Sequence, residues 1–146
     1  MHCIGIIWNV AINYEKEIIS LILAAGNILY AQKIDLDSRF DDFVFGIYFD
    51  ANPSHVEAKI QALKCCSSRT IKLMYLDFKT DYKYFSFNKG TFVYKNIETL
   101  KEKIRHEISL KIPNYYFDVI FHLTDCNYEY EKTLQFLESF LGKSIP

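Results

Sequence analysis

Residues 119–125 read Val119-Ile120-Phe121-His122-Leu123-Thr124-Asp125. The run from residue 117 to residue 123 is nearly all apolar, which is typical of a buried central strand. A helix is expected to follow from about residue 126 to residue 141. Its core stripe at helical spacing consists of Tyr130, Leu134, Leu137 and Leu141. The stretch therefore predicts a buried strand whose end carries a histidine, a hydroxyl and a carboxylate, directly before a helix.

Three more strands are expected earlier in the chain. Residues 3–8 form a short apolar run, which predicts another buried central strand. Residues 28–36 and 69–78 are the other two candidates. Residues 81–94 alternate aromatic and polar side chains around the turn signal Asn88-Lys89-Gly90, which predicts a small hairpin or an ordered loop.

Helices are expected between these strands. Residues 15–25 and 97–108 show amphipathic patterns, and Gly26-Asn27 supplies a stop for the first of them. Asp37-Ser38 can cap a short helix. Asn52-Pro53 opens another, because asparagine suits the cap and proline the first helical position. Two helices are thus expected between the second and third strands.

This order predicts one α+β domain over residues 1–146. Without the middle helices it is the ferredoxin-like βαββαβ antiparallel sandwich, here with an inserted helical pair and a C-terminal helix. We expect the helices to lie on one face of the sheet. A chain of 146 residues suits a single domain.

Composition restricts the classes of function. Half of the residues are hydrophobic and 24% are charged, which argues against disorder. A net charge of -1 argues against a dedicated nucleic-acid binder. We expect no membrane-spanning helix, no signal peptide and a cytoplasmic protein. The cysteines lack metal-ligand spacing, so we predict reduced thiols and no metal site on the protein itself. They are Cys3, Cys65, Cys66 and Cys126.

The chemistry is expected at His122. A helix N-terminus beside the imidazole offers backbone N–H groups to an anion. A neutral histidine there can act as a nucleophile toward phosphorus or as a general base. The alternative is a structural histidine at the end of a strand.

The segment from His122 to Lys132 resembles the active-site segment of the nucleoside diphosphate kinases. The signature of that family is Asn-x-x-His-Gly-[Ser/Ala]-Asp, followed by a helix that contains glutamates. In the family the histidine takes the γ-phosphate of a nucleoside triphosphate and passes it to a diphosphate. The resemblance also extends, weakly, to the order of elements over most of the chain.

The resemblance implies roles for individual residues. His122 falls on the phosphate-accepting position, Thr124 on the hydroxyl position and Asp125 on the acidic position. A glutamate of the next helix orients the imidazole in the family. Glu131 is our candidate for it, with Glu129 as the alternative.

Phosphate and base contacts are implied as well. Arg105 resembles the arginine of the Thr-Ile-Arg segment of the family, which contacts the nucleotide phosphates. Tyr48 and Phe49 are candidates for the aromatic clamp on the base, with core packing as the alternative. Lys89, Thr91 and Lys95 are loose candidates for the other arginine and threonine of the family.

Several positions depart from the family pattern. Trp8 stands where the first-strand Lys-Pro-Asp-Gly segment of the family has its phosphate-binding lysine. An indole carries no charge but can stack on a planar group or seal a pocket. Leu123 replaces the motif glycine and Val119 the asparagine. The departures favour a changed donor or acceptor.

We therefore expect a divergent phosphotransferase with a phosphohistidine intermediate. The resemblance implies a nucleoside triphosphate donor with Mg²⁺, a non-standard phosphate acceptor and a homo-oligomer. The alternative is a non-catalytic module of the same fold that binds a nucleotide or a protein. The His-x-Thr pattern of the 2H phosphoesterases is a third reading. It needs a second copy, which His2, His55 and His106 do not provide.

Overall fold

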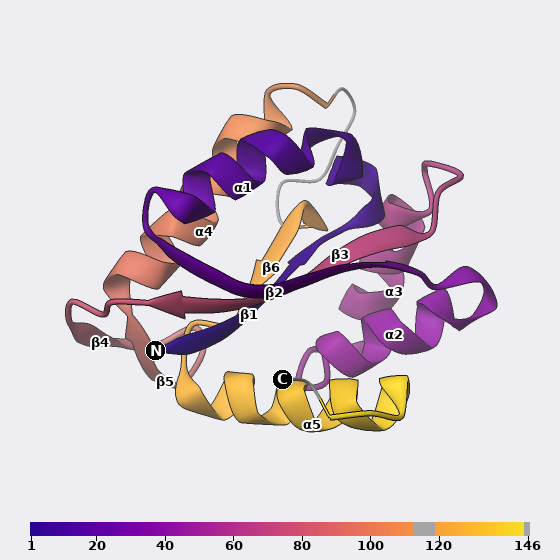
Figure 1. The fold of residues 1–146 in the computed structure, drawn as a ribbon. Helices are drawn as coiled ribbons and strands as arrows, with labels where there is room; N and C mark the ends of the chain where they lie inside the picture. Colours follow the sequence, from indigo (N-terminus) through magenta and orange to yellow (C-terminus); the bar gives the residue numbers. More distant parts are fainter. Residues whose placement is uncertain (113–118, 145–146) are drawn as a thin grey trace.

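The main sheet has the strand order of a ferredoxin-like domain. The computed structural model describes residues 1–112 and 119–144. Within them the sheet order is β2-β3-β1-β6 and every neighbouring pair is antiparallel (Figure 1). The strands are β1 (His2–Ile7), β2 (Gly26–Asp35), β3 (Thr70–Phe78) and β6 (Phe121–Leu123). The predicted fold class is confirmed, and β1 is central as expected.

The last strand differs from its prediction. Residues 117–118 lie outside the described residues, and β6 covers only three residues, at the edge of the sheet rather than in its centre. Its residues are nevertheless buried, because α4 (Lys95–Ser109) covers this edge, where the Nε–H of Arg105 donates to the Phe121 carbonyl at 3.0 Å. An apolar run thus indicates burial, which a covered edge strand provides as well as a central one.

Helices cover both faces of the sheet, so the prediction of a single helical face is wrong. Alternate side chains of β1 and β3 point to opposite faces. Ile4 and Leu73 pack with α2 (Phe40–Ile47), α3 (Pro53–Leu63) and α5 (Asn127–Leu141). Ile7 and Met74 pack with α1 (Glu15–Leu23) and α4. Figure 1 shows α1 and α4 on one side of the sheet and α2, α3 and α5 on the other. The inserted pair and the terminal helix supply the second layer.

Of the two inserted helices, the second begins where the sequence predicts. Asp37 and Ser38 do not cap the first, because they lie in a short helix before it and its cap position is Arg39, which makes no side-chain cap bond. After the short helices η1 (Asn9–Tyr14) and η2 (Asp37–Arg39), α2 starts at Phe40. The Asn52 side chain accepts the backbone N–H of Ser54 at 2.9 Å, and Pro53 takes the first position of α3. This cap satisfies one of the N–H groups that a helix start leaves unpaired.

The predicted hairpin is present as a separate two-stranded sheet. It consists of β4 (Lys83–Ser86) and β5 (Thr91–Tyr94), joined through Gly90 with φ of 69°. The Tyr84 hydroxyl donates to the Glu98 carboxylate on α4, and this bond raises the pKa of Tyr84 to about 12. The Tyr94 N–H donates to the Asp125 carbonyl at 3.1 Å. These contacts hold the hairpin tip beside the junction of β6 and α5.

No helix among the described residues is long and apolar enough to cross a membrane.

Candidate functional site

The junction of β6 and α5 buries three polar side chains within four residues. His122 is 7% exposed, and Thr124 and Asp125 are 0% exposed. Thr124 extends the pairing of the two strands, because its hydroxyl accepts the Ile4 N–H at 2.9 Å and its own N–H donates to the Ile4 carbonyl at 3.1 Å. Buried polar groups are costly unless they are hydrogen-bonded. Thr124 therefore serves the strand pairing, while its two neighbours meet other charged groups.

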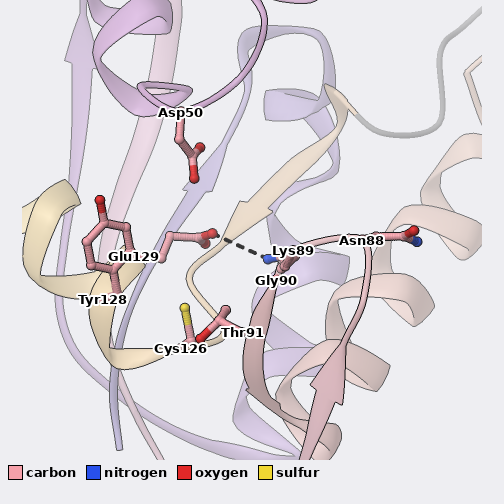
Figure 2. Close-up of a pocket in the computed structure, with 8 residues that line it drawn as sticks. All are labelled: Asp50, Asn88, Lys89, Gly90, Thr91, Cys126, Tyr128 and Glu129. Atoms are coloured by element: carbon pink, nitrogen blue, oxygen red, sulfur yellow. Dashed lines mark hydrogen bonds and ion pairs between the residues drawn. The ribbon is translucent and has the colours of Figure 1, made fainter.

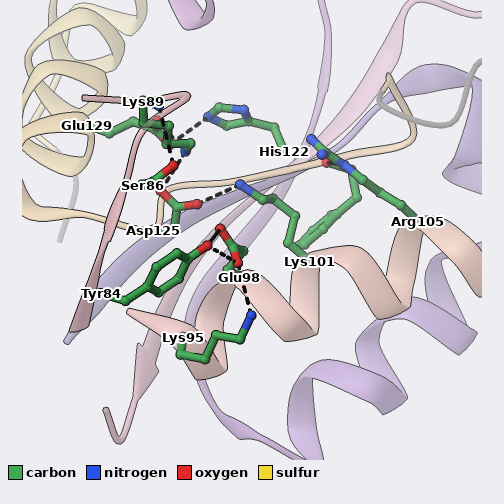
Figure 3. Close-up of polar contacts among 11 residues, drawn as sticks. Tyr84, Ser86, Lys89, Lys95, Glu98, Lys101, Arg105, His122, Asp125 and Glu129 are labelled. Atoms are coloured by element: carbon green, nitrogen blue, oxygen red, sulfur yellow. Dashed lines mark hydrogen bonds and ion pairs between the residues drawn. The ribbon is translucent and has the colours of Figure 1, made fainter. Parts of the chain in front are cut away.

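Asp125 holds two lysines from different elements. Its Oδ1 accepts Lys89 Nζ of the hairpin tip at 2.6 Å, and its Oδ2 accepts Lys101 Nζ of α4 at 2.8 Å (Figure 3). Burial alone would raise the pKa of Asp125, but the two ammonium groups outweigh it and lower that pKa below its usual value. Asp125 is therefore ionised and fixes both lysines at the site.

His122 is uncharged and has an unused nitrogen. Its ring meets the edge of Tyr48 with centroids 5.4 Å apart. Burial lowers the pKa of His122 well below its usual value, and Lys101, Arg105 and Lys89 lower it further. Its Nε2 has no hydrogen-bond partner and lies 4.0 Å from Oε1 of Glu129. A neutral imidazole keeps a lone pair, which is what a nucleophile needs.

Glu129 lies between the histidine and the hairpin lysine. Its Oε2 accepts Lys89 Nζ at 3.3 Å, while Oε1 is buried without a hydrogen bond. Burial raises the pKa of Glu129 against the opposing effect of Lys89. Oε1 faces Nε2 of His122 across 4.0 Å. Glu129 is therefore placed to select the tautomer of His122.

These side chains open into a pocket of about 230 Å³. Its cations come from three elements: Lys59 from α3, Lys89 from the hairpin tip, and Lys101 and Arg105 from α4. The Nε–H of Arg105 is anchored on the Phe121 carbonyl at 3.0 Å, which leaves the outer edge of its guanidinium to face a ligand. Burial lowers the pKa of Lys101, so a bound anion would stabilise its charged form. The pocket thus places four cationic side chains and two carboxylates, those of Asp50 and Glu129, around a histidine whose pKa is lowered.

The structure brings together part of the predicted site. His122, Tyr48 and Arg105 line the pocket, as does Phe49, and Asp125 supports it from behind. Lys89, only a loose candidate in the sequence, is central to it.

Three predicted residues lie apart from the pocket. Trp8 is 0% exposed in the core, stacked on Tyr48 at 6.0 Å and edge-on to Phe43 at 5.9 Å. Glu131 is exposed on α5 and does not line the pocket, whereas Glu129 does. The Thr124 hydroxyl bonds to Ile4 rather than to the histidine.

Lys101, Lys59 and Asp50 also line the pocket and were not singled out from the sequence. Lys101 carries a signal that could have revealed it. It falls on the apolar stripe of its helix, four residues after Ile97 and three before Ile104, and both neighbours are buried. A lysine on the core side of a helix needs a buried partner, which is Asp125 here. Lys59 and Asp50 carry no comparable signal.

Comparisons with known proteins agree on the architecture. No protein-family model matches the sequence, and no curated protein matches it. Among solved structures, a nucleoside-diphosphate kinase from Borrelia burgdorferi, a transition state mimic with bound vanadate and ADP, matches with a TM-score of 0.55. Its sequence identity is 10%, over 93% of this chain and 85% of that chain. The nucleoside diphosphate kinase of Aquifex aeolicus matches with a TM-score of 0.55 and 12% identity, over 93% of both chains.

The chain has a nucleoside diphosphate kinase-like fold. Identities of 10% and 12% establish this similarity of fold alone.

The described residues do not form a Mg²⁺ site of their own. The ligand atoms of Asp125, Cys126 and Glu129 lie within 4.8 Å of one another. Both Asp125 oxygens already accept lysine ammonium groups, however, and Mg²⁺ prefers oxygen ligands to a thiol.

Proposed function

We propose that this chain is a phosphotransferase that carries a phosphoryl group on His122 and receives it from a nucleoside triphosphate. One observation carries the proposal: His122, whose pKa burial lowers well below its usual value, lies in a pocket lined by Lys89, Lys101 and Arg105. The bound vanadate and ADP of the Borrelia burgdorferi kinase support it by analogy of fold. Mg²⁺ would accompany the donor, and homo-oligomer formation remains a prediction from the family resemblance.

The chain would perform the first transfer as follows. Glu129 accepts the N–H of Nε2, which leaves the lone pair on Nδ1 of His122. That nitrogen attacks the γ-phosphorus, the N–P bond forms, and the bond between the γ-phosphorus and its bridging oxygen breaks. The electron pair leaves on the nucleoside diphosphate. Lys101 and Arg105 stabilise the charge on the phosphoryl oxygens, an effect that is strong in a site with little water.

The second candidate is a non-catalytic module that binds an anionic ligand in the same pocket. Trp8 favours it, because the position that the resemblance assigns to a phosphate-binding lysine is occupied by a buried indole. The other cations of the pocket favour catalysis, because they supply charge from α4 and from the hairpin.

Labelling with γ-³²P-ATP and γ-³²P-GTP separates the two candidates. Phosphohistidine is labile in acid and stable in alkali, so the proposed enzyme should acquire label with that stability. His122→Ala should abolish the label, while His106→Ala, at an exposed histidine of α4, should retain it. Triphosphate binding without any label would support the binding module instead.

A further inference from the structure

A second pocket adjoins the histidine pocket and has a different character. It has a volume of about 630 Å³ and lies between the hairpin tip and the first turn of α5 (Figure 2). Asp50, Lys89 and Glu129 line both pockets, so the two form one continuous depression. Asp50 points from the segment after α2 toward the pair formed by Lys89 and Glu129 (Figure 2). The residues that line only the second pocket are Asn88, Gly90, Thr91, Cys126 and Tyr128.

The charges of the second pocket do not suit another polyphosphate. Its one cation among the described lining residues is Lys89, whose ammonium group is already bound by Asp125 at 2.6 Å and by Glu129 at 3.3 Å. Asp50 and Glu129 contribute two carboxylates, so an anionic ligand would meet repulsion. The hydroxyl of Thr91 and the carboxylates of Asp50 and Glu129 instead suit a ligand rich in hydroxyl groups.

We propose that this second pocket binds an uncharged hydroxyl compound, such as a nucleoside or a polyol, which receives the phosphoryl group from His122. The inference rests on the proposed function and names its acceptor as an alcohol rather than a nucleoside diphosphate.

The geometry supplies the base that an alcohol requires. A hydroxyl is a weak nucleophile and must lose its proton as it attacks, whereas the terminal oxygen of a diphosphate is already anionic. Glu129 lines both pockets, and its buried Oε1 has no hydrogen bond in the structure. The carboxylate that holds the Nε2 proton of His122 in the first transfer would turn to the acceptor hydroxyl in the second. The raised pKa of Glu129 agrees with a group that can take up a proton.

The step balances without any further reactant. The hydroxyl oxygen attacks the phosphorus on His122 and an O–P bond forms. The N–P bond breaks and its electron pair returns to the imidazole nitrogen. The hydroxyl proton passes to Glu129, which releases it to solvent after the product leaves. The products are a phosphate monoester and the neutral histidine with which the cycle began.

A chase of the labelled protein tests this directly. Protein labelled from γ-³²P-ATP is freed of nucleotide and mixed with buffer, ADP, GDP, adenosine, guanosine, glycerol or glucose. At least one uncharged compound should discharge the label roughly 100-fold faster than buffer, which is the scale of general-base catalysis, and should yield an acid-stable ester. Glu129→Gln should lose most of that acceleration.

A matched pair of threonine variants locates the acceptor. Thr91→Val removes one hydroxyl from the second pocket and should raise the half-saturating concentration of the uncharged acceptor by about 3- to 10-fold, the usual effect of one hydrogen bond. Thr80→Val, at an exposed position outside both pockets, should leave that concentration unchanged.

Each failure has its own signature. Discharge by ADP or GDP alone would overturn the alcohol acceptor while leaving the phosphohistidine intact. No label at His122 would refute the proposed function. In that case, NMR titration of the ¹⁵N-labelled protein with the same uncharged compounds tests whether the second pocket binds them at all. Shifts of the Gly90 and Thr91 amide signals would support binding there, and unshifted signals would contradict it. Shifted amides without discharge of a labelled protein would overturn the transfer step.

Discussion

Tyr48 lies between two regions of different character, the aromatic core around Trp8 and the cationic pocket around His122. On one side its ring stacks on Trp8 at 6.0 Å, within an aromatic part of the core that includes Phe40 and Phe43. On the other side its ring meets His122 edge-on at 5.4 Å, in a pocket with three lysines and an arginine. The resemblance to nucleoside diphosphate kinases places a phosphate-binding lysine at the position of Trp8.

The comparison shows that the cations of the histidine pocket come from elements other than the one that carries Trp8. Trp8, the residue after β1, contributes an aromatic side chain to the core, and the positive charge of the pocket comes from α3, α4 and the hairpin tip. In the core around Trp8, aromatic rings pack edge-on and stacked. In the pocket around His122, the buried carboxylate of Asp125 is paired with two lysines. A lost motif residue therefore does not by itself show that an anion site is lost.

The largest effect is expected from the aromatic core. Trp8→Ala would leave a cavity between Phe40, Phe43 and Tyr48 and should lower the free energy of unfolding by about 3–5 kcal/mol. Urea unfolding measures it, with Trp8→Phe as the milder control. If Trp8→Ala leaves stability unchanged and abolishes triphosphate binding instead, the separation of the two regions is wrong.

Arg105→Ala should act on the pocket with little effect on the fold. Loss of a charged phosphate contact should weaken triphosphate binding or phosphotransfer by roughly 10- to 1000-fold. Isothermal titration and labelling kinetics measure it, with Lys103→Ala, an exposed lysine of the same helix, as the control. Wild-type affinity in Arg105→Ala would mean that the arginine only caps the edge of β6.

Substitutions of two glutamates of α5 test whether Glu129 positions the His122 imidazole or only adds negative charge. Glu129→Gln should slow the formation of phosphohistidine by about 10-fold or more, because the imidazole loses the carboxylate that fixes its tautomer. Glu131→Gln should have no effect, because that side chain is exposed away from the pocket. Equal effects of the two variants would remove Glu129 from its assigned role.

The smallest effect concerns fluorescence. Trp8 is the only tryptophan and lies behind Tyr48 rather than in the pocket. Nucleotide binding should therefore change its emission only slightly, through a shift of the Tyr48 ring. Strong quenching at saturating ATP would place the ligand against the indole and contradict the observed pocket.

The sequence predicts the fold well and the site only in part. Periodicity and caps locate the strands, the helical pair and the hairpin, because these signals are local. The sequence cannot show that Lys89, Lys101 and Arg105 meet around His122, because a hairpin and a helix far apart in sequence from Asp125 bring them together. Glu129 could have been preferred to Glu131, since it lies four residues before the buried Thr133 and eight before Leu137.

The protonation of His122 tests the central claim most directly. Its pKa is lowered by burial and by three cations, so the folded protein should hold a neutral imidazole at pH values where the unfolded chain is protonated. The contribution of this group to stability is therefore present above a pH of about 6.5 and is lost as the pH falls below it. An NMR titration of the ring resonances, assigned with His122→Gln, measures the pKa. We predict that the His122 signal shows no titration midpoint near pH 6.5 and remains that of a neutral imidazole there, whereas a midpoint near 6.5 would contradict the account.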